Sequence, residues 1–319
     1  MRTAAALLLC ALLGAKAAHA EDYPSRPIKL VVPFAAGGAV GAVARTLSTP
    51  LSAGLGQSIV IENRGGAGGI IGMDAVAKSP PDGATLLLLH SGVTYMPGLY
   101  RTLPFDPAAD FANIGTAVSG SYVLVVNNDL PVKTVVELIA HAKAHPGKLS
   151  YASAGIGSTL HLGAEFLKRA ANIDIVHVPY KGAAQATTDL IGGQVQVMIG
   201  PVVAVLPLAQ AGKLRALALA SLKRSALAPD LPTITESGVP GFEITSWYGL
   251  AAPTGTPNAV IARLNAETGK AMQSPDVVAQ FRLQGYEPLL STPDEMSARI
   301  KTEIAIWTRV IRDAGIQPQ

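Results

Sequence analysis

Two glycine-rich turns hold the residues whose types and spacing could bind a ligand. The first turn runs from Phe34 to Gly38, and the second runs from Ser153 to Thr159. Each turn follows a short apolar run and precedes apolar residues at helical spacing. Glycines between a strand and a helix let backbone N–H groups point at a ligand, and the helix N-terminus adds partial positive charge. Both turns therefore predict a site for a small anion such as a carboxylate.

A purely structural interpretation of these turns stays open. The glycines could serve only to make a tight turn, and Ser158 could serve only as the N-cap of the helix that begins there. The same strand–glycine–helix arrangement occurs in both halves of the chain, which favours binding. Nucleotide binding is unsupported, because the first turn is neither followed by Lys-Ser/Thr nor spaced as G-x-G-x-x-G.

Side chains beside the turns complete the candidate site. His161 lies one turn into the second helix, and Tyr180-Lys181 ends a strand at the expected rim of a cleft. A single histidine is more often structural, and Lys181 could be only a solvated rim residue. The candidate ligand-binding residues are Phe34, Ala35, Ala36, Gly37, Gly38, Ser91, Ser153, Gly155, Gly157, Ser158, Thr159, His161, Tyr180, Lys181, Ala183 and Pro201.

A serine hydrolase is the enzymatic alternative. Ser158 and His161 could meet on one helix, and Glu165 follows one turn later. The chain lacks the G-x-S-x-G elbow that exposes a catalytic serine. Neither His161 nor His177 has a second histidine or a carboxylate at metal-ligand spacing. We therefore expect no catalytic residue, no metal and no cofactor.

The elements that must position these residues alternate between strands and helices. This alternation predicts an α/β fold with mostly parallel sheets, in which ligands lie at the carboxyl ends of the strands. Strands are expected at 28–34, 58–62, 84–90, 122–127, 149–153, 173–179, 195–199, 214–220 and 246–251. Helices are expected at about 40–51, 70–78, 134–144, 158–171, 183–191, 258–272, 276–284 and 293–314.

Composition and the N-terminal segment predict an exported protein. Of the 319 residues, 49% are hydrophobic, which supports packed cores and about two domains. Residues 1–20 combine Arg2, an apolar run and Ala18-His19-Ala20, the pattern of a secretory signal peptide. The single cysteine, Cys10, lies in this segment, so disulfides and thiolate chemistry are excluded after its removal. The 25 basic and 22 acidic side chains are nearly balanced without basic runs, which excludes nucleic acid as a partner.

Long motifs in a fixed order resemble a known family. The segments are YPSRPIKLVVPFAAGG, ENRGGAGGIIG, YASAGIGSTLHLGAEFL, HVPYKGAAQATTDLIGGQVQVMIG and LPTITESGVPGFEITSWYGLAAPTGTP. They resemble the Bug family, the extracytoplasmic solute-binding receptors associated with tripartite tricarboxylate transporters, from about Tyr23 to the C-terminus. The resemblance implies a type II periplasmic binding-protein fold, with two α/β domains joined by two crossing strands and hinge closure around one ligand.

This resemblance, together with the crossing strands, gives a full set of expectations. Residues 1–20 are the signal peptide, residues 21–123 and 249–319 form domain 1, and residues 124–248 form domain 2. The resemblance implies a small carboxylate as ligand and membrane transporter subunits as partners. We expect a monomeric receptor in the periplasm, with a ligand sensor for a signalling partner as the main alternative. Gly41 stands where family members usually carry an aspartate, which affects ligand identity and the rigidity of the first turn.

Overall fold

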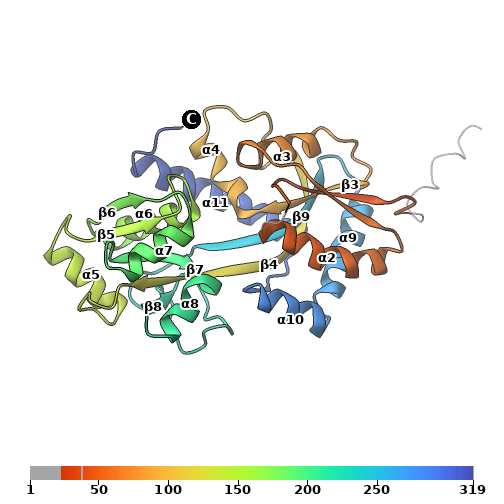
Figure 1. Cartoon of the computed structure of the whole chain (residues 1–319). Coiled ribbons are helices and arrows are strands. Elements are labelled where there is room, and N and C mark those ends of the chain that lie inside the picture. Colours follow the sequence, from red (N-terminus) through yellow and green to blue (C-terminus); the bar gives the residue numbers. More distant parts are fainter. Residues whose placement is uncertain (1–22, 37–38, 319) are drawn as a thin grey trace, which may run out of the picture.

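One curled sheet with helices on both sides organises the chain into two lobes (Figure 1). The computed structural model describes residues 23–36 and 39–318. Within this part of the chain the sheet has ten strands, in the order β2-β1-β3-β9-β4-β7-β5-β6, and β8 and β10 both pair with β4. The predicted signal peptide and the glycine pair Gly37-Gly38 lie outside the described residues.

The first lobe is built from strand–turn–helix units. Its parallel strands are β1 (Ile28–Val32), β2 (Ile59–Asn63) and β3 (Thr85–His90), and the helices between them are α2 (Ala39–Leu55), the short η1 (Ala67–Gly69) and α3 (Ile70–Ala77). Side chains alternate across a strand. Leu86 and Leu88 of β3 accordingly pack in one apolar cluster, and Leu87 and Leu89 pack in another on the opposite face.

Two long strands cross from the first lobe to the second (Figure 1). They are β4 (Phe111–Val126) and β9 (Thr245–Pro253), and they pair with each other antiparallel. The expected strand at 246–251 lies within β9, and the expected strand at 122–127 covers the end of β4 and extends one residue past it. Four of the nine strand pairings in the described residues are parallel, and the five that involve β4 or β9 are antiparallel. Parallel pairing therefore holds in the outer strands, and the centre of the sheet is antiparallel.

The second lobe repeats the strand–helix alternation around one apolar cluster. The chain reaches this lobe from β3 through the short η2 (Ser91–Thr94) and α4 (Met96–Leu99) and then along β4. Its strands are β5 (Ser150–Ser153), β6 (Val176–Pro179), β7 (Val197–Pro201) and β8 (Arg215–Leu219). Its helices are α5 (Val135–Ala144), α6 (Thr159–Ala171), α7 (Ala183–Ile191) and α8 (Val202–Gln210). None of the expected helices corresponds to α8.

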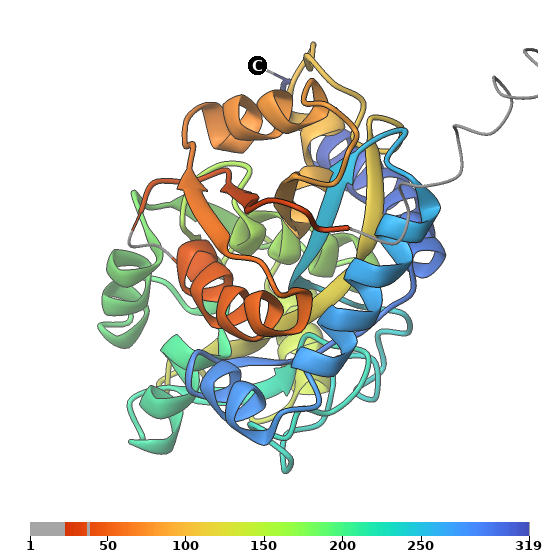
Figure 2. The same ribbon diagram turned by 90° about the vertical axis from the view of Figure 1, so that its right-hand side faces the viewer.

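The C-terminal segment returns to the first lobe. It contains α9 (Asn258–Ala271), α10 (Pro275–Leu283), β10 (Tyr286–Pro288) and α11 (Pro293–Asp313). Figure 2 shows α2 and α9 beside each other in this lobe, where they pack in one apolar cluster. None of the helices in the described part of the chain combines the length and apolar character needed to cross a membrane.

The last helix, α11, packs against both lobes. Met296 and Ile300 join the apolar cluster beneath α3, whereas Trp307 and Ile311 join the cluster of the second lobe. A capping box at Thr292 fixes its start. The predicted domain boundaries assign this helix to domain 1, and those boundaries stay a prediction.

Candidate ligand-binding site

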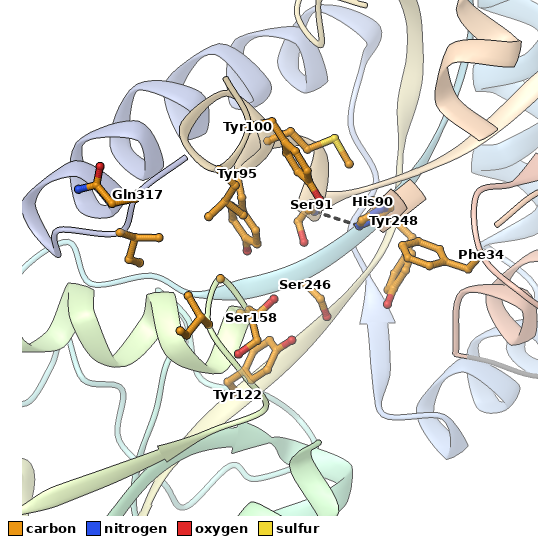
Figure 3. Close-up of a pocket in the computed structure, with 18 residues that line it drawn as sticks. Phe34, His90, Ser91, Tyr95, Tyr100, Tyr122, Ser158, Ser246, Tyr248 and Gln317 are labelled. Carbon is orange, nitrogen blue, oxygen red and sulfur yellow. Dashed lines mark hydrogen bonds between the residues drawn. The ribbon is translucent and has the colours of Figure 1, made fainter. Parts of the chain in front are cut away.

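A cavity of about 480 Å³ lies between the two lobes, above the crossing strands (Figure 3). Most of its walls come from the β3–α4 segment, the turn before α6, and strands β4 and β9, and the turn after β1, η1 and the C-terminal segment complete them. The lining includes Phe34, His90, Ser91, Tyr95, Leu99, Tyr100, Tyr122, Ile156, Gly157, Ser158, Thr159, Ser246, Tyr248 and Gln317. Hydroxyl groups and aromatic rings therefore dominate the walls.

The alternation of strand side chains explains the contribution of β9. Ser246 and Tyr248 face the cavity, and Trp247 between them is fully buried on the other face. There the Trp247 Nε1 donates to both carboxylate oxygens of Glu303, at 3.0 and 2.9 Å. On β4, Tyr122 lies across the cavity floor from Ser246 (Figure 3). The crossing strands thus present polar groups to the cavity and buried packing groups to the opposite face of the sheet.

Internal hydrogen bonds fix the turn before α6. The Ser158 Oγ donates to the Gly155 carbonyl at 2.7 Å and accepts from the His161 N–H at 3.3 Å, so the predicted N-cap is confirmed. Gly155 and Gly157 have φ values of +116° and +77°, which side chains rarely adopt. A helix N-terminus whose preceding turn is fixed in this way is suited to binding an anion.

The cavity lining carries no formal charge at neutral pH in the part of the chain that the structure describes, because it contains no Asp, Glu, Lys or Arg. Burial raises the pKa of the phenols of Tyr95, Tyr122 and Tyr248 and keeps them protonated. Burial also lowers the pKa of His90 to about 4, so its imidazole is neutral. Neutral donors in a low-dielectric site can hold a carboxylate without a cationic side chain.

His90 has a defined tautomer in this wall. Its Nδ1 accepts the Gly92 N–H at 3.0 Å and therefore carries no hydrogen. The proton of the neutral ring then resides on Nε2, which is buried and has no hydrogen-bond partner among the described residues. The ring of Phe34 lies 4.8 Å from the imidazole, centroid to centroid, and covers it.

The structure brings five of the predicted site residues together in the cavity, and Gly37 and Gly38 lie outside the described residues. The five are Phe34, Ser91, Gly157, Ser158 and Thr159. Ser153 and Gly155 belong to the turn before α6 but do not line the cavity, and neither does His161 at the start of α6. Ser153 is fully buried. Ala35 and Ala36 are exposed in the first turn. Tyr180 and Lys181 follow β6, Ala183 begins α7, and Pro201 ends β7 opposite Tyr122. None of these last six lines the cavity.

The residues that sequence analysis missed come mainly from the crossing strands and the β3–α4 segment. Tyr122, Ser246 and Tyr248 lie on strands that were expected, and the Ser-Trp-Tyr alternation in β9 could have identified the two that face upward. His90 directly precedes the predicted Ser91, and Tyr95 follows it by four residues. Their inward direction depends on η2, a short helix that no motif indicated.

The arrangement expected of a serine hydrolase is not formed by Ser158 and His161. The Ser158 hydroxyl donates to a carbonyl, and the His161 Nδ1 accepts the Gly157 N–H at 3.0 Å. Ser153 Oγ does lie 2.7 Å from His177 Nε2, but Ser153 is fully buried away from the cavity. Across the described residues, no three His, Cys, Asp or Glu side chains gather as metal ligands would.

Gly41, where the family resemblance implies an aspartate, lies beside the first turn. A Cβ on Gly41 would lie 3.4 Å from Arg45 Nη1 and 3.9 Å from Asn63 Nδ2. Asn63 in turn donates to the Phe34 carbonyl at 3.1 Å. An aspartate would therefore reach both an arginine and the residue that supports the turn, and Gly41 makes neither contact.

Comparison with known proteins identifies the family. Bordetella pertussis protein BugT is 40% identical over 298 residues, covering 93% of this chain and 91% of BugT. The structure of R. palustris Rpa4515 with adipate shares 39% identity and a TM-score of 0.75, covering 93% of this chain and all of that one. The structure of a TctC solute-binding protein from Polaromonas, with no ligand, shares 29% identity and a TM-score of 0.84, covering 91% and 99%.

These likenesses confirm the predicted fold class and the resemblance to Bug proteins. Family members of this kind are solute-binding proteins. The model of the family described as tripartite tricarboxylate transporter family receptor matches residues 43–316. The chain therefore belongs to the tripartite tricarboxylate transporter receptor family.

Proposed function

We propose that this protein is a periplasmic receptor that captures a small carboxylate in the cavity between its lobes and delivers it to a tripartite membrane transporter. The observation that carries the proposal is the uncharged cavity, which is lined by hydroxyls and faces the N-terminus of α6. The relative determined with adipate supports the carboxylate as ligand class. The role is one of binding, and no residue is assigned to catalysis.

The lining suits a carboxylate attached to an apolar or aromatic body. Ser91, Ser158 and Thr159 supply hydroxyls, and the turn before α6 supplies backbone N–H groups. Phe34 and Leu99 supply apolar surface. A pocket of a few hundred Å³ with a few convergent polar groups is typical of small-molecule sites. Because no cationic side chain lines the cavity, selectivity would depend on shape and on the placement of neutral donors.

Hinge closure is part of the proposal. The structure has a higher TM-score with the ligand-free Polaromonas protein than with the adipate-bound R. palustris protein, although its identity with the former is lower. This difference fits an open conformation. Closure would bring Tyr180, Lys181 and Ala183 toward the cavity, and a ligand would stabilise the closed state by its differential affinity for it.

A thermal-shift screen tests the proposal. The chain without residues 1–20 is refolded to remove any carried-over ligand and mixed with mono-, di- and tricarboxylates and acidic amino acids. A ligand at about 100 times its Kd adds about 2.7 kcal/mol, which corresponds to roughly 4 °C in Tm for a chain of this size. A saturable shift with one class is expected, and no shift with any member would contradict the proposal.

A matched pair of threonine variants links the shift to the cavity. Thr159→Val removes a cavity hydroxyl with little change of shape, whereas Thr188→Val removes an exposed hydroxyl on α7 that donates to the Ala184 carbonyl. The first variant should reduce the ligand-induced shift, and the second should leave it unchanged. Equal shifts in both variants would place the binding elsewhere.

A further inference from the structure

Two stacked histidines lie directly behind the turn that lines the cavity. The rings of His161 on α6 and His177 on β6 have centroids 4.0 Å apart and planes inclined by 12°. The ring of Tyr151 on β5 continues the stack, 4.9 Å from His177. None of the three side chains lines the cavity. The proposed function therefore leaves this cluster without a role.

Each histidine holds one part of the turn. The His161 Nδ1 accepts the Gly157 N–H at 3.0 Å. The His177 Nε2 lies 2.7 Å from the Ser153 Oγ, and the same Oγ accepts the Gly155 N–H at 3.1 Å. The two imidazoles thus fix the backbone on both sides of Ile156, a residue that lines the cavity.

Only the neutral form of His161 can make its contact. A protonated imidazole has two donors and no acceptor, so it cannot receive the Gly157 N–H. Two imidazolium ions at 4.0 Å would also repel each other. Burial is the main cause that lowers the pKa of both rings, that of His161 to about 4, which favours the neutral form.

The charged groups that face the stack, Glu165 and Lys168, come from α6, and the titratable phenol of Tyr151 comes from β5. Glu165 raises the pKa of both imidazoles and Lys168 lowers it. The Lys168 Nζ pairs with Glu165 Oε1 at 2.8 Å, and the Tyr151 hydroxyl donates to the same oxygen. The carboxylate is therefore already engaged by two donors, which limits its ability to attract a proton to the histidines.

We propose that His161, supported by His177, is a positioning residue for ligand binding: its neutral Nδ1 anchors Gly157, so that the turn presents Ser158 and Thr159 to the ligand. This inference deepens the proposed function and rests on it. Protonation of His161 releases the Gly157 N–H, and the binding-competent turn is then populated only in the fraction of molecules with a neutral ring.

Two substitutions at position 161 separate an anchoring role from simple packing. The Oδ1 of His161→Asn can replace the Nδ1 as acceptor, and His161→Leu fills space without an acceptor. With adipate as probe at pH 7.0, calorimetric titration should show a Kd raised tenfold or more by His161→Leu and largely recovered by His161→Asn. Equal affinity of His161→Leu and the unmodified protein would overturn the proposal.

The pH profile gives a readout that a packing role would not produce. The ratio of Kd for the unmodified protein to Kd for His161→Asn cancels the titration of adipate itself. With a pKa of about 4, the apparent Kd should rise about twofold at pH 4 and about fourfold at pH 3.5. The proposal predicts that this ratio follows the same curve, and a constant ratio would refute it.

A ligand-free measurement distinguishes failure of this inference from failure of the proposed function. In NMR spectra without adipate, the backbone amide resonance of Gly157 should titrate with the same midpoint as the His161 ring. If Gly157 follows His161 but adipate causes no heat in any variant, the anchor is supported and adipate is not a ligand. If Gly157 does not follow His161, the anchor is wrong whatever binds.

Discussion

The contact between Trp247 and Glu303 beneath the cavity leads to a prediction about Trp247→Phe. Trp247 is fully buried, and its Nε1 donates to both oxygens of Glu303. Glu303 also pairs with Arg299 Nη1 at 3.1 Å and accepts from the Thr94 Oγ1 at 3.3 Å. Burial raises the pKa of Glu303, and the bond from Trp247 opposes that rise. Phenylalanine would remove the donor, and the buried carboxylate of Glu303 would then be stabilised by fewer hydrogen bonds.

The expected decrease in the free energy of unfolding has two parts. A hydrogen bond to a charged group contributes about 1.5–3 kcal/mol. The smaller ring leaves a void that costs about 1 kcal/mol more. Trp247→Phe should therefore lower the free energy of unfolding by about 3 kcal/mol at pH 8, where Glu303 is ionised.

The cost should shrink on acidification. Loss of the donor raises the pKa of Glu303 further, so the native variant binds a proton at a higher pH than the native unmodified protein. The unfolded chains titrate alike at this residue, so lowering the pH stabilises the variant relative to the unmodified protein. The difference in unfolding free energy should fall by about 1–2 kcal/mol between pH 8 and pH 5.

Urea unfolding followed by far-UV circular dichroism measures these differences at each pH. The matched control places Trp247→Phe in a Glu303→Gln background, where no carboxylate remains to titrate. There the difference should not depend on pH. A pH-independent difference in the protein with Glu303, or a cost below about 1 kcal/mol at pH 8, would refute the reasoning.

Three further predictions concern the walls of the cavity. Burial lowers the pKa of His90 from 6.5 to about 4, so this residue alone should lower the stability by about 3 kcal/mol as the pH drops from 6.5 to 4. His90→Asn keeps an acceptor for the Gly92 N–H and should flatten that part of a urea-unfolding pH profile. An unchanged slope would show that His90 is not the group responsible. Ser158→Ala should cost about 1 kcal/mol in urea unfolding through loss of the N-cap, and Ser158→Gly only a few tenths; equal costs would exclude capping as the cause. Gly41→Asp should stabilise the chain by about 1 kcal/mol, because it replaces a helical glycine and pairs with Arg45, and a lower Tm would contradict this.

The strand–turn–helix units were predictable from the sequence because local signals agree with the tertiary structure. Ala84 to His90 was expected as a buried strand, and β3 spans Thr85–His90. Ser158 was expected as an N-cap, and it accepts the His161 N–H. In both cases the preference of a few neighbouring residues is sufficient, and distant contacts only reinforce it.

Among the parts of the fold that were not predicted, α8 and the start of β4 have local signals that are weak or misleading. Residues 202–210 are almost wholly apolar, contain Pro207 and follow β7 without a polar turn, so nothing in the sequence separates α8 from the strand before it. The first ten residues of β4 include glycines at 115 and 120 and several polar residues, which is typical of a loop. Its extended form depends on pairing with β9, more than 120 positions later.

The cavity itself was only partly predictable for the same reason. The turn before α6 could be identified from its glycines and hydroxyls. The floor, however, joins Tyr122 of β4 to Ser246 and Tyr248 of β9, and only the crossing of the two strands brings these residues together. His161 was expected at the ligand and lies instead behind the turn, because its Nδ1 is engaged by Gly157.

Calorimetric titration of the refolded chain tests the central claim most directly, with the best carboxylate from the thermal-shift screen as titrant. Ser246→Phe serves as the comparison, because its ring would fill the cavity above β9. The account predicts saturable binding with one ligand per chain in the unmodified protein and no measurable binding in Ser246→Phe, whose unliganded Tm stays within a few degrees. Equal binding by both proteins, or no heat from any carboxylate in the unmodified protein, would contradict the account.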